Sequence, residues 1–382
     1  MKIFYVPIEP IDTRYTADWI EQFILEFTKA KAKYEVILPK ESTESSIKNG
    51  DVLDTFNTSF TKLSQLNILV NYINLGLITD EDVILFADAW FPGLETLFYI
   101  RNMMNMSFKI AGIFHAGSYD PYDFTSRHGM RHWAQHQELA WLNGLDIIFV
   151  ATQWHKDLIV MNSGVFNEDK IFVTGLPFYG RDLALQYKIP DKKENIVVFP
   201  HRMDPEKHPE RFERLKRKFP QWSFIYTLKE TKNRKEYFEL LARAKVMISF
   251  ADQETFGYST LECMALGVRV IVPNKLSYRE VVPKMFRYNK EKEISSLLEN
   301  FMNTDSIPEY SEITKWENSI PNMLQVIKFK LREFAKIRKA EELLEQQEQE
   351  RIAQEKEERR LKQIEKKEEA KKQSQSGGTE ND

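Results

Sequence analysis

The sequence predicts an α/β protein of two doubly wound units, each a parallel sheet with helices on both faces. Apolar runs of strand length alternate with amphipathic segments of helix length over about the first 330 residues. The alternation occurs twice, and glycines and prolines cluster between the two series at residues 176–191. A length of 382 residues also favours two domains over one.

The first series is expected to place polar side chains at the carboxyl edge of its sheet. One strand ends just before Asp88 and another just before His115. In the first expected helix, Trp19, Phe23 and Phe27 are spaced by four residues and share one face. The expected strands are 2–6, 34–38, 83–87, 109–114 and 147–150, and the expected helices are 16–31, 61–76 and 131–143.

The second series repeats this order and supplies a second sheet. Its expected strands are 196–199, 223–226, 246–250 and 268–272, with helices at 209–218, at 235–245 and after Gly257. We therefore expect an N-terminal domain over residues 1–180 and a second domain over 181–315. A cleft between two such units presents the carboxyl ends of both sheets, where ligands bind in this architecture.

The last part of the chain has a different composition. After a crossing helix expected at 316–334, residues 335–372 are mostly Glu, Gln, Lys and Arg, and 373–382 are expected to be disordered. The charged segment is interpreted as a solvated single helix held by ion pairs between residues i and i+4, with a coiled coil as the alternative. Such a helix is a candidate contact for a protein partner.

Composition excludes several classes of protein. The net charge of −3 gives no general signal for nucleic acid or membranes. Residues 341–382 have a net charge of −4, so the rest of the chain is near +1. Cys263 is the only cysteine, so no intrachain disulfide can form. The N-terminus has the pattern of a strand, and no apolar run is long enough to cross a bilayer. We expect a soluble cytoplasmic protein with no membrane partner.

The most informative segment for function is 254–262, where Glu254 and Glu262 are separated by seven residues. An apolar strand precedes Glu254, and a helix is expected to begin after Gly257, with Glu262 about two turns into it. The N–H groups at that helix start favour a phosphate. The alternative is structural, with Glu254 as a helix cap and Glu262 on the surface.

A second polar loop follows the strand 196–199 and contains Arg202 and Lys207. Arg202 can form a forked contact with a phosphate, and Lys207 adds a mobile positive charge. Both could also be ordinary loop charges, and His115 could be a buried histidine with satisfied hydrogen bonds.

With these motifs in order, the chain resembles GT-B-fold glycosyltransferases, and most of all the retaining group called glycosyltransferase family 4. Those enzymes carry a Glu, seven residues and a second Glu, and also an Arg-x-x-x-x-Lys loop after the first strand of the donor domain. The resemblance is architectural over residues 1–330 and specific over 196–275. Thr152 stands where the family has a Ser-rich helix start, and Trp316 resembles a tryptophan near the crossing helix.

The resemblance implies sugar transfer from a nucleoside-diphosphate sugar with retention of configuration. It implies catalytic roles for His115, Glu254, Arg202 and Lys207. Glu254 would hold sugar hydroxyls, and Glu262 would hold the ribose hydroxyls. The implied donor-binding residues are Arg202, Lys207, Glu254, Phe256, Gly257, Tyr258, Ser259 and Glu262. The nucleotide sugar is a co-substrate, and no metal or other cofactor is required.

The acceptor is predicted less directly. The loop 7–16 lacks the glycines that the family has there, and Arg14 is a candidate replacement. The segment 86–92, which contains Asp88, resembles glycosyltransferases of tailed bacteriophages, some of which modify hydroxymethylated bases in DNA. In that case the protein would act in the host cytoplasm. A DNA acceptor predicts a basic face on the N-terminal domain, for which Arg127 and Arg131 are candidates.

Three further hypotheses remain open. His128, His132 and His136 recur every four residues, so a metal site is the alternative to a packed or acceptor-facing helix. The acceptor could be a glycan or a protein instead of DNA. The chain could also be a non-catalytic GT-B protein that acts through its charged tail. The sugar, the nucleobase and the oligomeric state are not predicted.

Overall fold

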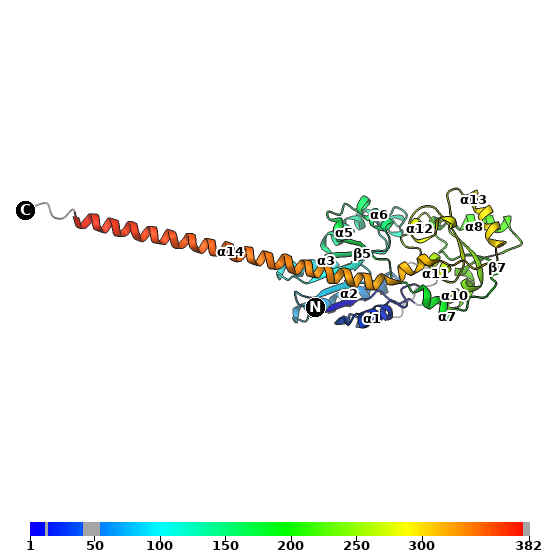
Figure 1. Ribbon diagram of the computed structural model, residues 1–382, viewed down its shortest axis with the longest axis horizontal. Helices are drawn as coiled ribbons and strands as arrows, with labels where there is room; N and C mark the ends of the chain where they lie inside the picture. Colours follow the sequence, from blue (N-terminus) through cyan, green and yellow to red (C-terminus); the bar gives the residue numbers. More distant parts are fainter. Residues whose placement is uncertain (12–13, 41–53, 377–382) are drawn as a thin grey trace, which may run out of the picture. The chain divides into compact units, whose positions relative to one another are not determined.

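The computed structural model describes residues 1–11, 14–40 and 54–376 and contains two parallel sheets, as the sequence predicts. The chain divides into two compact units, Met1–Leu324 and Gln325–Asp382. Both sheets belong to the first unit (Figure 1). Within the described residues, no helix is both long and apolar enough to cross a membrane.

The first sheet has six parallel strands in the order β2-β1-β3-β4-β5-β6. Four of its strands match the expected positions closely, whereas β6 was not expected. The strands are β1 (Ile3–Val6), β2 (Tyr34–Val36), β3 (Val83–Phe86), β4 (Lys109–Ile113), β5 (Ile147–Val150) and β6 (Ile171–Val173).

The part of the unit before residue 180 carries the first sheet and is here called the first half; the part from 180 to 324 carries the second sheet and is called the second half. The helices of the first half cover both faces of the first sheet. Trp19, Phe23 and Phe27 are buried on one face, where Phe23 lies 4.5 Å from Tyr5 between ring centroids, so the predicted helical face is confirmed. Leu69 and Trp141 belong to the core on the other face. The helices are α1 (Trp19–Lys29), α2 (Thr55–Asn74), α3 (Leu94–Met103), α4 (Phe124–Arg127), α5 (Arg131–Gly144) and α6 (Gln153–Ser163).

Two expectations about these helices were wrong. Helix α2 begins at Thr55, six residues before the expected start, because the Asp54 side chain caps it by accepting from the Asn57 N–H at 3.1 Å. The three histidines do not share one helix, because α4 ends at Arg127, Gly129 adopts a left-handed conformation with φ of 70°, and α5 begins at Arg131. His128 therefore lies outside the helix that carries His132 and His136.

The second sheet has five parallel strands in the order β11-β10-β9-β7-β8. Strands β7, β8, β9 and β10 correspond to the four expected strands, whereas the two-residue edge strand β11 was not expected. The strands are β7 (Glu194–Phe199), β8 (Ser223–Tyr226), β9 (Ala244–Ile248), β10 (Arg269–Pro273) and β11 (Arg287–Tyr288). The helices are α7 (Gly180–Gln186), α8 (Pro209–Lys218), α9 (Thr227–Glu230), α10 (Arg234–Arg243), α11 (Tyr258–Ala265), α12 (Tyr278–Val281) and α13 (Glu293–Met302).

Two features of the segment around the paired glutamates differ from expectation. Strand β9 runs from Ala244 to Ile248, two residues earlier than predicted, because α10 already ends at Arg243. Glu262 is the fifth residue of α11, so it lies little more than one turn into the helix instead of two. Trp316 lies in the 3-10 helix Ser311–Asn318.

The chain ends in one long helix, α14 (Ser319–Ser376), which Figure 1 draws as continuous. It includes most of the predicted crossing segment and the predicted charged tail, and it extends four residues into the segment expected to be disordered. Its distal part carries local ion pairs, such as Arg351 with Glu348 at 2.6 Å and with Glu355 at 3.3 Å. Such pairs stabilise an exposed helix without a packed core.

Candidate active site

The two loops predicted to bind a donor lie against each other at the carboxyl edge of the second sheet. Strands β7 and β9 are neighbours, so the loops that follow them meet. The N–H of Asp252 donates to the carbonyl of Glu206 at 2.8 Å. Lys207 Nζ donates to the carbonyl of Gln253 at 2.5 Å and lies 3.5 Å from Glu254 Oε2. The structure therefore brings together Lys207 and Glu254, as the resemblance implied.

Arg202 belongs to the same loop, but its guanidinium is held by a neighbouring acid. Arg202 lies 3.1 Å from Asp204, and Asp204 lies 3.6 Å from Arg127 of the first half. Arg127 also pairs with the buried Glu206 at 3.1 Å. Arg127 was predicted as an acceptor-binding residue, and its guanidinium pairs with Asp204 and Glu206 of the donor loop.

Gly257 stands at the N-terminal cap of α11. Its φ of 89° is in the left-handed region, so a residue with a side chain would be strained there. The following residues, Tyr258 and Ser259, begin the helix and direct their N–H groups beyond its N-terminus. Phe256 is buried and packs edge-on against Trp316, with ring centroids 5.4 Å apart. Phe256 thus supports the helix start through packing.

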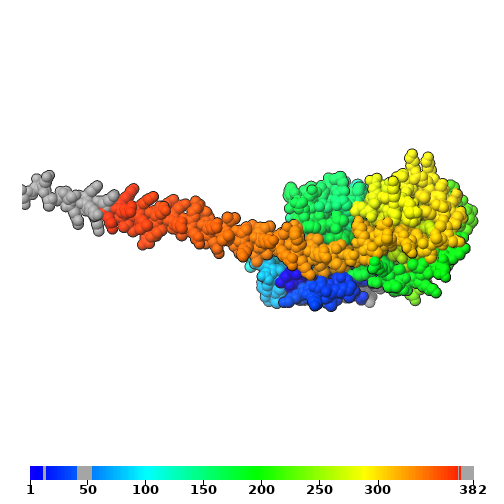
Figure 2. Space-filling model, viewed as in Figure 1, coloured from blue at the N-terminus to red at the C-terminus, as the bar shows by residue number. Residues whose placement is uncertain are grey.

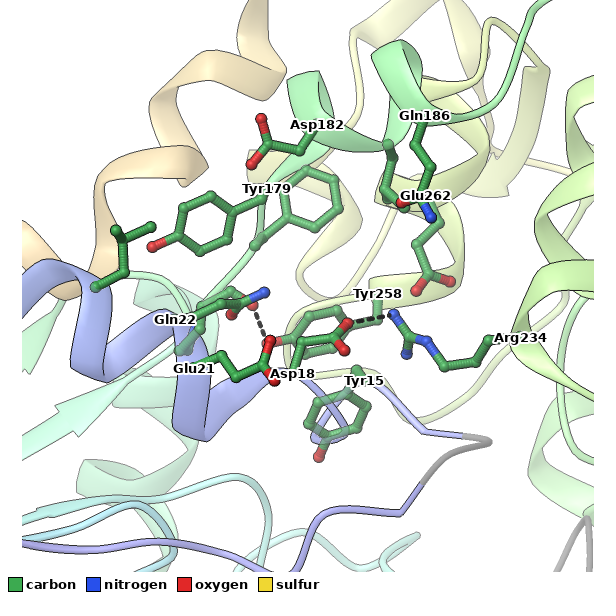
Figure 3. Close-up of a pocket in the computed structure, with 14 residues that line it drawn as sticks. Tyr15, Asp18, Glu21, Gln22, Tyr179, Asp182, Gln186, Arg234, Tyr258 and Glu262 are labelled. Carbon is green, nitrogen blue, oxygen red and sulfur yellow. Dashed lines mark hydrogen bonds and ion pairs between the residues drawn. The ribbon is translucent and has the colours of Figure 1, made fainter. Parts of the chain in front are cut away.

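Glu262 lines a pocket of about 240 Å³ that the loop at Tyr15, α1, α7, α10 and α11 surround (Figure 3). Glu262 accepts a hydrogen bond from the Tyr237 hydroxyl at 2.8 Å. Burial raises the pKa of its carboxyl to about 7, although the nearby Arg234 and the Tyr237 hydrogen bond lower it. Figure 3 shows Arg234 directed toward Asp18, and their side chains lie 3.2 Å apart.

The loop at residues 7–16 reaches this pocket from the first half. Its residues 12 and 13 lie outside the described part of the chain. The carbonyl of Arg14 accepts from the Arg234 guanidinium at 2.5 Å. The ring of Tyr15 stacks on Tyr258 with centroids 4.1 Å apart and planes 9° apart. Aromatic and backbone contacts therefore join the loop to the start of α11.

His115 has both ring nitrogens engaged within the first half of the unit. Nε2 lies 2.8 Å from the carbonyl oxygen of Ala87, which can only accept, so Nε2 carries the proton. Nδ1 therefore accepts from the Tyr15 hydroxyl at 3.0 Å. Burial lowers the pKa of His115, which keeps the ring neutral. The backbone carbonyl of His115 accepts from Thr255 Oγ1 at 2.9 Å, which places His115 beside the Glu254 loop.

The other predicted acceptor residues are not gathered with Arg127. Asp88 pairs with Lys62 at 2.7 Å and accepts from the N–H of Trp90 at 3.0 Å. Arg131 is exposed at the start of α5. Across the described residues, no group of three or more His, Cys, Asp or Glu side chains is arranged to hold a metal ion.

Sequence reasoning missed Glu280, which joins the halves from α12. Its carboxylate accepts from the N–H groups of Gln153 at 2.9 Å and Trp154 at 2.7 Å, at the start of α6. Figure 2 shows the green residues around α6 directly against the yellow residues around α12. No local pattern in the sequence indicates this contact, because the partners are more than 120 residues apart.

Comparison with known proteins identifies the fold. The chain is similar to a sucrose-phosphate synthase from Thermosynechococcus elongatus, with 12% identity, a TM-score of 0.60, and coverage of 86% of this chain and 98% of that one. It is also similar to a UDP-forming α,α-trehalose-phosphate synthase from Burkholderia xenovorans, with 13% identity, a TM-score of 0.55, and coverage of 87% and 98%. The two sheets therefore form a GT-B glycosyltransferase fold.

The catalytic domain of starch synthase IV from Arabidopsis thaliana, a structure with ADP and acarbose bound, has the same arrangement. The identity is 11% and the TM-score 0.52, over 86% of this chain and 99% of that domain. No protein-family model matches the chain. A segment of 68 residues is 41% identical to the tRNA-queuosine alpha-mannosyltransferase of Drosophila melanogaster, and this match spans 18% of each protein.

Proposed function

We propose that the protein is a glycosyltransferase that uses a nucleoside-diphosphate sugar and retains the configuration of the sugar. The observation that carries this proposal is the contact between Lys207 and Glu254 just before the start of α11, with Arg202 in the same loop as Lys207. Two cations and a helix N-terminus can stabilise the negative charge of a departing diphosphate. A carboxylate beside them can accept hydrogen bonds from sugar hydroxyls. The GT-B fold and its nucleotide-sugar-dependent neighbours support the same reaction class.

In the proposed reaction, the bond between the anomeric carbon and the diphosphate oxygen breaks, and both electrons leave with the diphosphate. The acceptor hydroxyl oxygen bonds to the same carbon from the face that the diphosphate leaves. Its proton passes to a diphosphate oxygen. Lys207 and Arg202 stabilise the charge that develops on the leaving group, and Glu254 orients the sugar. His115 lies at this edge, where its Nδ1 accepts from the Tyr15 hydroxyl and its backbone carbonyl accepts from Thr255.

The pocket beside Glu262 is the proposed nucleoside site. Glu262 supplies a carboxylate for ribose hydroxyls, and Tyr15 and Tyr258 supply aromatic surface. A volume of about 240 Å³ is close to the lower end of small-molecule sites. The pocket and the cation loops both adjoin α11, so a single nucleoside diphosphate can occupy both.

For the acceptor, we propose a hydroxyl group on a modified nucleoside of a nucleic acid. The support is the short match to a mannosyltransferase whose name specifies tRNA-queuosine, together with the likeness of residues 86–92 to phage glycosyltransferases that modify DNA. A hydroxymethylated base in DNA and a modified nucleoside in tRNA are both members of this class. Arg131, which is exposed, is a candidate contact to the backbone of such an acceptor.

The test is turnover of a panel of nucleotide sugars, with water, tRNA and hydroxymethylated DNA as acceptors. We expect one donor to be consumed, and Lys207→Met and Glu254→Gln each to lower turnover by about 100-fold or more. Lys216→Met on α8 is the matched control and should leave turnover unchanged. Proton NMR of the product reports the anomeric configuration. A lack of turnover with every donor would contradict the proposed use of a nucleotide sugar. A product of inverted configuration would contradict the proposed retention.

A further inference from the structure

One buried side chain in the donor loop has no role in the reaction described so far. His201 lies two residues after the end of β7 and directly before Arg202, and it is only 6% exposed. Its ring packs edge-on against Phe199, with centroids 5.1 Å apart. Its Nδ1 lies 3.5 Å from the hydroxyl of Ser259, the second residue of α11. His201 therefore lies beside the two parts of the site that suit a phosphate.

The second ring nitrogen of His201 is buried and makes no hydrogen bond to the described part of the chain. A serine hydroxyl can donate to Nδ1, and that arrangement leaves the ring proton on Nε2. Most buried polar groups in folded proteins are hydrogen-bonded, because leaving one unpaired opposes folding. An unpaired N–H at a site with two cations and a helix N-terminus indicates a ligand with an acceptor oxygen.

We propose that His201 is a further donor-binding residue, which donates its Nε2–H to a phosphoryl oxygen of the nucleoside diphosphate. This inference rests on the proposed function, because it deepens the description of the same donor site. A phosphoryl oxygen is the group that the neighbouring Lys207 and Arg202 also favour. A phosphoryl oxygen can accept hydrogen bonds from all three side chains.

The surroundings keep His201 in the form that this role needs. Burial, followed by the charges of Lys207 and Arg202, holds the pKa of His201 well below its usual value. The ring is therefore neutral at physiological pH and adds a donor without a third positive charge. A third cation would be repelled by the two already present and would lose its hydration on burial.

The experiment compares the binding of a nucleoside diphosphate with that of the same nucleoside, measured by calorimetry on the full chain. UDP, ADP and GDP are first screened against the wild-type protein, and the tightest is used. His201→Phe keeps an aromatic ring and removes the N–H, whereas His201→Gln keeps an N–H donor. His208→Asn is the matched control, because His208 lies in the same loop but pairs with Asp252 at 2.6 Å and Glu210 at 3.1 Å.

We expect His201→Phe to weaken diphosphate binding about tenfold, as for the loss of one hydrogen bond, and to leave nucleoside binding within about twofold. His201→Gln should recover most of the loss, and His208→Asn should change neither. In the wild-type protein labelled with 15N-histidine, the diphosphate but not the nucleoside should shift the His201 Nε2 resonance. This spectrum tests the contact even if His201→Phe does not fold.

Two results would overturn the inference. If His201→Phe weakens diphosphate and nucleoside binding equally, or neither, and the Nε2 resonance does not move, His201 is a packing residue and only this inference fails. If the wild-type protein binds none of the three diphosphates, and Lys207→Met leaves donor turnover unchanged, the proposed function fails together with this inference.

Discussion

Glu262 shows how one side chain can serve a site and weaken the fold. Its carboxyl is buried and its pKa is raised to about 7 from an ordinary value of 4.5. The folded protein therefore binds more protons than the unfolded chain between these two pH values, so its stability falls as pH rises through that range. A glutamine of the same shape would avoid this loss. Retention of an ionisable group here fits the proposed contact to ribose hydroxyls.

We predict that Glu262→Gln stabilises the protein above pH 7 and weakens nucleotide binding. The raised pKa of Glu262 corresponds to a gain in stability for Glu262→Gln of about 3 kcal/mol at pH 8, and this gain should vanish below about pH 4.5. The Gln side chain can still accept from Tyr237, so the folded contact is kept. Urea unfolding between pH 4.5 and 8 measures the effect, with the exposed Glu299→Gln as control. A stability difference independent of pH would mean that Glu262 is charged in the folded state.

Residues that share a local motif were predictable, and residues joined by folding were not. The spacing of Glu254 and Glu262, and of Arg202 and Lys207, is visible in the sequence because each pair belongs to one loop or one strand-loop-helix segment. The partner of Arg127 was not visible, because Glu206 lies 79 residues away in the other half. His201 was also missed, because its proposed role in donor binding follows from its burial beside Ser259, which the residue type alone does not indicate.

At the scale of elements, the sequence predicted the strands of both sheets, including the edge strands β2 and β8, but missed the two short edge strands β6 and β11. Strands β5 and β8 have the predicted bounds because four consecutive residues are buried or paired there. Strand β6 has three residues and β11 has two, too few for a periodic pattern. Their strand geometry depends on pairing with β5 and β10, which only the folded chain supplies.

The start of α6 is an element whose cap comes from the other half of the unit. Glu280 accepts from the first two N–H groups of the helix, and Thr152 Oγ1 accepts from the His155 N–H at 3.2 Å. An anion at a helix N-terminus is favourable, because the unpaired N–H groups and the helix dipole are positive there. The cap therefore stabilises α6 and the contact between the two halves together.

We predict that Glu280→Ala lowers stability by about 1 kcal/mol. It should also raise hydrogen exchange at the amides of Gln153 and Trp154, because both lose their acceptor. Glu239→Ala is the control, since Glu239 is exposed on α10 and pairs at the surface with Lys235 at 3.9 Å. Exchange that stays slow at both amides in Glu280→Ala would show that the cap is dispensable.

At the scale of the whole molecule, every candidate site residue lies in the unit Met1–Leu324. Its two sheets each supply part of the site, and contacts between distant segments complete it. Thr152 donates to the carbonyl of Thr255 at 2.8 Å, and Tyr258 donates to the carbonyl of Pro177 at 2.9 Å. The distal part of α14 forms ion pairs within itself. The residues proposed to bind the donor and the charged tail therefore belong to different units of the chain.

We predict that removing residues 335–382 leaves the rate of donor turnover within about twofold of the full chain, because all groups proposed to bind the donor remain. Turnover is measured with water and with tRNA or hydroxymethylated DNA, and near-UV circular dichroism checks the fold. Loss of transfer to the nucleic acid alone would assign the tail to acceptor binding. Loss of biological function without any donor turnover in the full chain would favour a non-catalytic GT-B protein that acts through its tail.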